Sequence, residues 1–219
     1  MNRSLKVQTK TVNTLIFGAT GGIGASLART LPAPLILAAR NAKKLRELEL
    51  ETGAYAVPTD VCNELELDAL VQEVIARGGL KVLIYAVGDI APASILEANA
   101  QDLERVWRAN VLGAQLVLKH FAPLLEPHAR VYLLGAKTEL ITFKNFSGYA
   151  ASKAALDSLA AIARLELRCA VTVVKPPAVN TDFWQKLGAR APRNAIGADA
   201  VAQAILLDLA QDPKLELQL

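Results

Sequence analysis

The sequence predicts an α/β fold, in which one domain is built on a doubly wound parallel sheet of about seven strands with helices on both faces. Short apolar runs alternate with longer amphipathic stretches, and the apolar runs are continuous rather than alternately polar and apolar. Such strands are typical of parallel sheets buried on both faces. The chain has 219 residues, of which 53% are hydrophobic, so residues 1–219 are predicted to form one domain.

The first half of the chain contains four of the expected strands, separated by helical stretches. Asn41 and Asn63 are residues that commonly cap helix N-termini, and glycines follow where the two helices would end. The expected strands are 14–17, 35–38, 54–58 and 82–86, and the expected helices are 23–31, 41–53 and 63–78.

The second half continues the alternation with longer helices. Its expected helices are 103–120, 149–168 and 199–210, and its expected strands are 131–134, 171–174 and an edge strand at 215–217. The stretch 182–197 has no clear period, and it is either a flap over a site or an ordinary surface loop.

Composition excludes several classes of function. The formal net charge is only +3, and Lys and Arg are spread along the chain, which argues against a nucleic-acid partner. No signal-peptide core follows Met1, and no apolar run approaches the roughly 20 residues of a membrane span, so we expect a cytoplasmic protein without a membrane partner. Cys62 and Cys169 lack metal-ligand spacing, so no metal site is expected. Residues 1–12 are expected to be a frayed tail.

A glycine-rich turn joins the first expected strand to the first helix. Glycines there permit a tight turn and let backbone N–H groups approach a pyrophosphate at the helix N-terminus. The turn contains Gly18, Thr20, Gly21, Gly22, Ile23 and Gly24. Its position between strand and helix indicates a dinucleotide site.

The end of the second strand indicates which dinucleotide binds. A carboxylate there would bond the adenosine ribose, but the sequence reads Ala38-Ala39-Arg40. Arg40 could instead pair with a 2′-phosphate, which favours NADP(H) and leaves NAD(H) possible. The alternative for Arg40 is a solvated side chain at the start of a helix.

From Asn13 to about Ala210 the chain resembles the short-chain dehydrogenase/reductase superfamily. Its glycine signature matches Gly18-x-x-x-Gly22-x-Gly24, and its catalytic pair matches Tyr149 and Lys153 in Y-A-A-S-K. Further matches are Asp60-Val61, Ala86-Val87-Gly88, Asn110 and Pro176-Pro177-Ala178-Val179-Asn180-Thr181, with Tyr85 and Ala86 replacing two family asparagines and Pro177 replacing a glycine. The resemblance implies a Rossmann-type fold and a homodimer or homotetramer.

The resemblance also implies which residues bind the cofactor. Asp60 and Val61 would hold the adenine ring, and Thr181 would bond the nicotinamide carboxamide. The complete implied set is Gly18, Thr20, Gly21, Gly22, Ile23, Gly24, Arg40, Asp60, Val61, Ala86, Gly88, Tyr149, Lys153, Val179 and Thr181.

Tyr149 and Lys153 are spaced for proton transfer. A tyrosine has an unperturbed pKa of about 10, and a nearby ammonium lowers it by stabilising the phenolate. Lys153 lies one helical turn after Tyr149, so the two side chains share a face. By resemblance, Asn110 would anchor a water that relays protons to Lys153.

One expected catalytic group is missing. The family usually has a serine thirteen residues before the tyrosine, and Ala136 stands there. Thr138 could supply the hydroxyl instead, Lys137 could polarise the carbonyl, or the protein could bind cofactor without ordinary turnover.

These observations predict an NADP(H)-dependent short-chain oxidoreductase that interconverts a carbonyl and an alcohol on a small organic substrate. A first alternative is a non-catalytic NADP(H)-binding protein, which Ala136 favours. A second is a nucleotide-sugar-modifying enzyme, because Gly18, Gly21 and Gly24 also fit G-x-x-G-x-x-G. Such enzymes usually have a sizeable C-terminal substrate domain, whereas this chain ends soon after its sixth expected strand.

Overall fold

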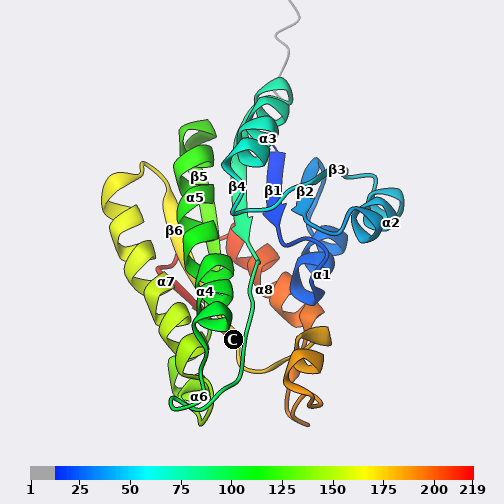
Figure 1. The fold of residues 1–219 in the computed structure, drawn as a ribbon. Coiled ribbons are helices and arrows are strands. Elements are labelled where there is room, and N and C mark those ends of the chain that lie inside the picture. The colour runs from blue at the N-terminus through cyan, green and yellow to red at the C-terminus, as the bar shows by residue number, and fades with distance from the viewer. Residues whose placement is uncertain (1–12) are drawn as a thin grey trace, which may run out of the picture.

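The computed structural model describes residues 13–219, so the expected tail at 1–12 lies outside the described residues. A seven-stranded sheet has the order β3-β2-β1-β4-β5-β6-β9, and every neighbouring pair is parallel (Figure 1). Its strands are β1 (Asn13–Phe17), β2 (Leu35–Ala39), β3 (Tyr55–Pro58), β4 (Leu80–Tyr85), β5 (Leu125–Leu134), β6 (Ala170–Lys175) and β9 (Glu216–Gln218). The predicted α/β fold is confirmed, including the edge strand near the C-terminus.

Helices cover both faces of this sheet. Neighbouring residues of a strand point to opposite faces. In β4, Tyr85 packs in the same core as α3, α5 and α7, whereas Ile84 packs with α1, α2 and α8. These helices are α1 (Gly22–Thr30), α2 (Ala42–Thr52), α3 (Glu64–Ala76), α5 (Gly113–Phe121), α7 (Ser147–Glu166) and α8 (Ala198–Leu209).

Local chemistry explains where the predicted helices begin and end. The Asn41 side chain accepts a hydrogen bond from the Lys44 N–H at 3.0 Å, and the Asn63 side chain accepts one from Leu65 at 3.2 Å. Both asparagines therefore satisfy N–H groups that the first turn leaves unpaired. Gly53 ends α2 in the left-handed conformation with φ of 68°, which glycine adopts without steric penalty.

Several short elements escaped sequence prediction. The expected helix 103–120 begins earlier, as α4 (Ala100–Trp107), and a π-helical segment, η1 (Arg108–Leu112), separates it from α5. The stretch 182–197, expected to be irregular, contains η3 (Asp182–Leu187) and β8 (Ile196–Gly197), which pairs with β7 (Val179–Asn180). The other short elements are η2 (Ala122–Leu124) and α6 (Thr138–Ile141).

The strand order reverses between β1 and β4, which places a crevice at the carboxyl ends of these two strands. The glycine turn follows β1, and the Ala86–Gly88 segment follows β4. None of the helices in residues 13–219 is long and apolar enough to cross a membrane.

Candidate active site

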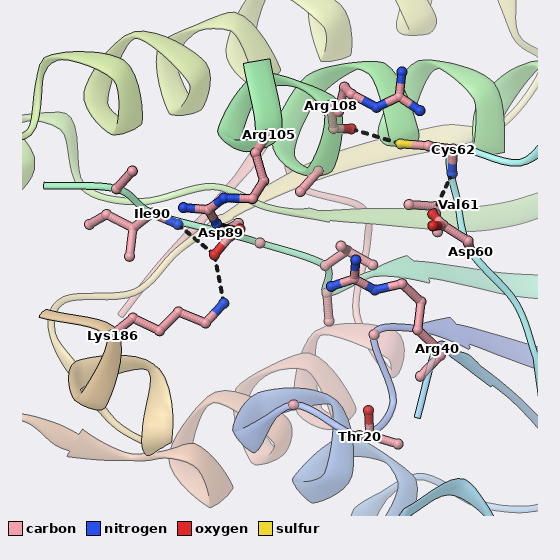
Figure 2. A pocket seen from close by; sticks show the side chains of 18 of the residues that line it. Thr20, Arg40, Asp60, Val61, Cys62, Asp89, Ile90, Arg105, Arg108 and Lys186 are labelled. Carbon is pink, nitrogen blue, oxygen red and sulfur yellow. Dashed lines mark hydrogen bonds and ion pairs between the residues drawn. The ribbon is translucent and has the colours of Figure 1, made fainter. Parts of the chain in front are cut away.

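A cavity of about 1050 Å³ lies in this crevice (Figure 2). Eight residues of the predicted cofactor set line it: Gly18, Thr20, Gly21, Arg40, Asp60, Val61, Ala86 and Gly88. They come from the ends of four neighbouring strands and the loops that follow them, as expected for a doubly wound sheet. The structure therefore brings together residues that are far apart in the sequence.

The glycine turn is packed too tightly for larger residues. A Cβ at Gly18, where φ is 77°, would lie 2.8 Å from the Ala86 carbonyl, and one at Gly24 would lie 2.1 Å from the Gly18 oxygen. A Cβ at Gly22 would lie 2.4 Å from the Thr181 methyl group, so the turn also contacts the segment after β6. No side chain caps α1, which leaves its first N–H groups available to a phosphate.

The end of the cavity near β2 and β3 is where the resemblance places adenosine. Arg40 lines the cavity with an exposed side chain, and within residues 13–219 no carboxylate forms an ion pair with it. The Asp60 carboxylate accepts a hydrogen bond from the Cys62 N–H at 2.9 Å, which orders the loop after β3. Arg40 is thus positioned to meet an anionic group.

Two other residues of the predicted cofactor set pack against the core instead. Ile23 in α1 and Val179 in β7 are half-buried and pack against the core that α1, α2 and α8 share. Neither is among the residues that line the cavity. The other predicted cofactor residues that do not line it are Gly22, Gly24, Tyr149, Lys153 and Thr181.

Tyr149 and Lys153 lie one turn apart on α7, as predicted, with the Lys153 Nζ 5.8 Å from the Tyr149 ring centroid. Nζ donates a hydrogen bond to the Leu134 carbonyl at 2.6 Å, at the end of β5. A Cβ at Gly88 would lie 3.6 Å from the same Nζ. Lys153 therefore reaches from α7 to the end of β5 and to Gly88, which lines the cavity, although neither Lys153 nor Tyr149 lines it.

Asn110 is buried in η1, and its amide connects two parts of the site. Its Oδ1 accepts from the Asp89 N–H at 2.7 Å, and its Nδ2 donates to the Asp89 carbonyl at 2.9 Å and to the Ser152 Oγ at 2.8 Å. The Ser152 hydroxyl in turn donates to the Tyr149 carbonyl at 2.7 Å. Asn110 therefore joins the end of β4 to the turn of α7 that carries Tyr149. Sequence reasoning did not assign a role to Ser152, although it lies within Y-A-A-S-K.

Burial shifts the pKa values of the pair in opposite directions. It raises the pKa of Tyr149 to about 12 and lowers the pKa of Lys153 to about 8. In both cases burial disfavours the charged form. The expectation that the Lys153 ammonium lowers the pKa of Tyr149 is therefore wrong for this structure, because burial raises it. At neutral pH Tyr149 therefore holds its proton, as a proton donor in carbonyl reduction must.

Two aromatic rings lie close to the Tyr149 ring. The Phe146 ring lies 6.2 Å from it in an edge-on arrangement, and the Phe183 ring of η3 lies 5.8 Å away. Thr181 caps η3 through a hydrogen bond from the Phe183 N–H to its Oγ1 at 3.4 Å. The Trp184 indole donates to the Val179 carbonyl at 2.8 Å. The segment after β6 thus contacts the predicted catalytic tyrosine.

Comparisons with known proteins agree with this geometry. The profile of the short chain dehydrogenase family matches residues 12–192. The chain belongs to the short-chain dehydrogenase family. A solved short-chain oxidoreductase from Thermus thermophilus is 37% identical, with a TM-score of 0.83 over 92% of this chain and 98% of the other.

Two curated relatives are more distant in sequence. An uncharacterised oxidoreductase of Staphylococcus aureus strain MW2 is 26% identical, over 90% of each chain. The L-fucose dehydrogenase of Rattus norvegicus is 28% identical, over 87% of this chain and 75% of the relative. As a member of the short-chain dehydrogenase family, the 219-residue chain is itself an oxidoreductase.

The position at which the resemblance leads us to expect a serine holds a buried alanine. Ala136 lies two residues after the end of β5 and is 8% exposed. Thr138 is exposed and begins α6, and Lys137 before it is half-buried. That the Thr138 hydroxyl takes the place of the serine stays a prediction.

The lowered pKa of Lys153 has a consequence for stability. An unfolded lysine, with a pKa of 10.5, binds a proton between pH 8 and 10.5 that folded Lys153, with a pKa of about 8, does not bind. The free energy of unfolding should therefore rise with pH in this window relative to Lys153→Met, by up to about 3 kcal/mol. Urea denaturation of both proteins at pH 7.5, 8.5 and 9.5 measures this difference, and identical pH profiles would contradict it.

Proposed function

We propose that this protein is an NADP(H)-dependent oxidoreductase that interconverts a carbonyl and an alcohol on a small organic substrate. The observation that carries the proposal is the placement of Lys153, whose Nζ reaches from beside Tyr149 to the ends of β4 and β5. A lysine that only stabilised a helix surface would be exposed, whereas Lys153 is 7% exposed. A buried ammonium beside a tyrosine, at the edge of a dinucleotide cavity, suits proton transfer.

When bound, NADP(H) supplies or accepts the hydride. In the reduction, the Tyr149 hydroxyl donates its proton to the substrate oxygen. The Lys153 ammonium then stabilises the phenolate until it is reprotonated. Asn110 and Ser152 hold the turn of α7 that carries Tyr149 against the end of β4. Because the site provides no serine at position 136, Thr138 is the candidate for bonding the substrate oxygen.

One relative supports this reaction class, since it is named a dehydrogenase of L-fucose, a small molecule with several hydroxyl groups. The proposal includes a homodimer or homotetramer, which the molar mass in solution tests. It also includes a cytoplasmic location and no nucleic-acid or membrane partner.

The preference for NADPH over NADH should depend on Arg40. Calorimetric titration is expected to show tighter binding of NADPH, and Arg40→Ala should weaken NADPH binding by about ten- to a hundredfold because a charge-assisted bond is lost. NADH binding should be nearly unchanged. Arg46→Ala is the matched control, because Arg46 lies on α2 and pairs with Glu49 rather than lining the cavity. Binding of neither dinucleotide would overturn the proposed function, and tighter NADH binding would overturn the preference.

A further inference from the structure

Asp89, the residue after Gly88, is a buried acid that sequence reasoning did not single out. Its side chain is only 10% exposed. Its backbone is held on both sides by one partner, because the Asn110 amide accepts from its N–H at 2.7 Å and donates to its carbonyl at 2.9 Å. Asp89 is therefore a fixed point beside the predicted catalytic residues.

The Asp89 carboxylate binds two cations from different elements. The Lys186 Nζ of η3 lies 2.6 Å from Oδ1, and Arg105 of α4 pairs with Oδ2. Figure 2 shows the two side chains reaching Asp89 from opposite sides. Burial alone would raise the pKa of Asp89, but the hydrogen bond and charge of Lys186, the Ile90 N–H and the charge of Arg105 together outweigh it, and the pKa lies below its usual value. The carboxylate is thus ionised at neutral pH.

The pair between Asp89 and Lys186 joins two separate segments that line the cavity. Both residues line the cavity, but Asp89 follows β4 and Lys186 belongs to the segment after β6. The same short element places Phe183 against Tyr149, with ring centroids 5.8 Å apart. The Lys186 Nζ also lies 5.7 Å from the Phe183 ring centroid. Through Phe183 and Lys186, η3 thus contacts both Tyr149 on α7 and Asp89 after β4.

We infer that Asp89 is a positioning residue that latches η3 across the cofactor cavity through Lys186 and thereby slows release of the dinucleotide. The inference rests on the proposed function in one respect, namely that the ligand is NADP(H). Arg105 holds the carboxylate from the other side and has a second partner in Asp102, at 2.9 Å. Loss of Lys186 would therefore release η3 without leaving Asp89 unpaired.

The expected change in the dissociation rate depends on how exposed the ion pair between Asp89 and Lys186 is. Lys186 is 48% exposed, so solvent screens its pair with Asp89. We expect release of the latch to change rates by about three- to tenfold. An isosteric change at either partner should give the same result, and changing both should add nothing further, because the two residues act as one pair.

The first experiment measures NADPH dissociation by stopped-flow fluorescence. Asp89→Asn, Lys186→Gln and the double variant should each release NADPH about three- to tenfold faster than the wild type. Lys186→Arg keeps the charge and should remain near the wild-type rate. Lys119→Gln is the control, since it breaks an exposed ion pair with Glu64 that does not line the cavity. Unchanged dissociation in Asp89→Asn and Lys186→Gln, with NADPH bound, overturns the inference.

A second experiment needs no cofactor. Trypsin cleaves after Lys186 and after Arg190, which is exposed and follows η3. In Asp89→Asn, initial cleavage after Lys186 should accelerate by about three- to tenfold relative to cleavage after Arg190 in the same molecule. An unchanged ratio overturns the latch. Accelerated cleavage in a protein that binds neither NADPH nor NADH supports the latch and overturns the proposed function instead, so the two failures are distinguishable.

Discussion

Tyr149→Phe is expected to lower NADPH-dependent carbonyl reduction by about 10²–10⁴-fold while leaving NADPH affinity nearly unchanged. Phenylalanine keeps the ring that packs against Phe146 and Phe183 but has no proton to donate. The buried Lys153 side chain should keep its position in this variant, because its hydrogen bond goes to the Leu134 carbonyl rather than to the tyrosine. Steady-state oxidation of NADPH with a panel of ketones and aldehydes measures turnover, and calorimetry measures binding.

The matched control is Tyr55→Phe, which removes a tyrosine hydroxyl from the protein surface. The Tyr55 hydroxyl donates to Glu73 of α3 at 2.8 Å and neither residue lines the cavity, so activity should not change. A Tyr149→Phe protein that keeps more than a tenth of its turnover would contradict the assignment of Tyr149 as proton donor. NADPH binding without turnover of any substrate by the wild type would instead favour a binding protein.

The fold was predictable because its main elements follow local rules. Continuous apolar runs indicated the buried parallel strands, and Asn41 and Asn63 marked helix starts that the structure confirms. The π-helical turn at Arg108–Leu112 was not predictable, since it depends on the tertiary bond from the buried Tyr85 hydroxyl to the Ala109 carbonyl at 2.6 Å. The strands β7 and β8 have two residues each, which is too short for a periodic pattern.

Some residues of the candidate site could likewise be predicted from the sequence, and others could not. Residues inside local motifs, such as Tyr149 and Lys153, could be found because one helical turn places them together. The pair between Asp89 and Lys186 joins positions 97 residues apart, and neither residue belongs to a spacing that predicts the other. Charged residues in loops are common on protein surfaces, so only the folded structure shows that this acid is buried and held by Asn110.

Ala136→Ser is expected to raise carbonyl-reducing activity by about 10²-fold, because a positioned donor for the substrate oxygen contributes roughly that much. Ala136 is buried two residues beyond Leu134, the last residue of β5, whose carbonyl binds Lys153. A serine there would add its hydroxyl at the same end of the sheet as the proposed catalytic pair, Tyr149 and Lys153. A buried hydroxyl without substrate lacks a partner, so the free energy of unfolding should fall by about 1–3 kcal/mol. Measurements of kcat/KM and of urea denaturation test the two effects separately.

A companion change shows whether Thr138 now substitutes for the serine. If its hydroxyl bonds the substrate oxygen, Thr138→Val should lower kcat/KM by about 10²-fold in the wild type but much less beside Ala136→Ser, since one donor would replace the other. If Thr138→Val has no effect in the wild type, the native site works without this donor, and the gain from Ala136→Ser stands alone. A serine variant that binds NADPH normally but reduces carbonyls more slowly than the wild type would contradict the placement of position 136 beside the substrate oxygen.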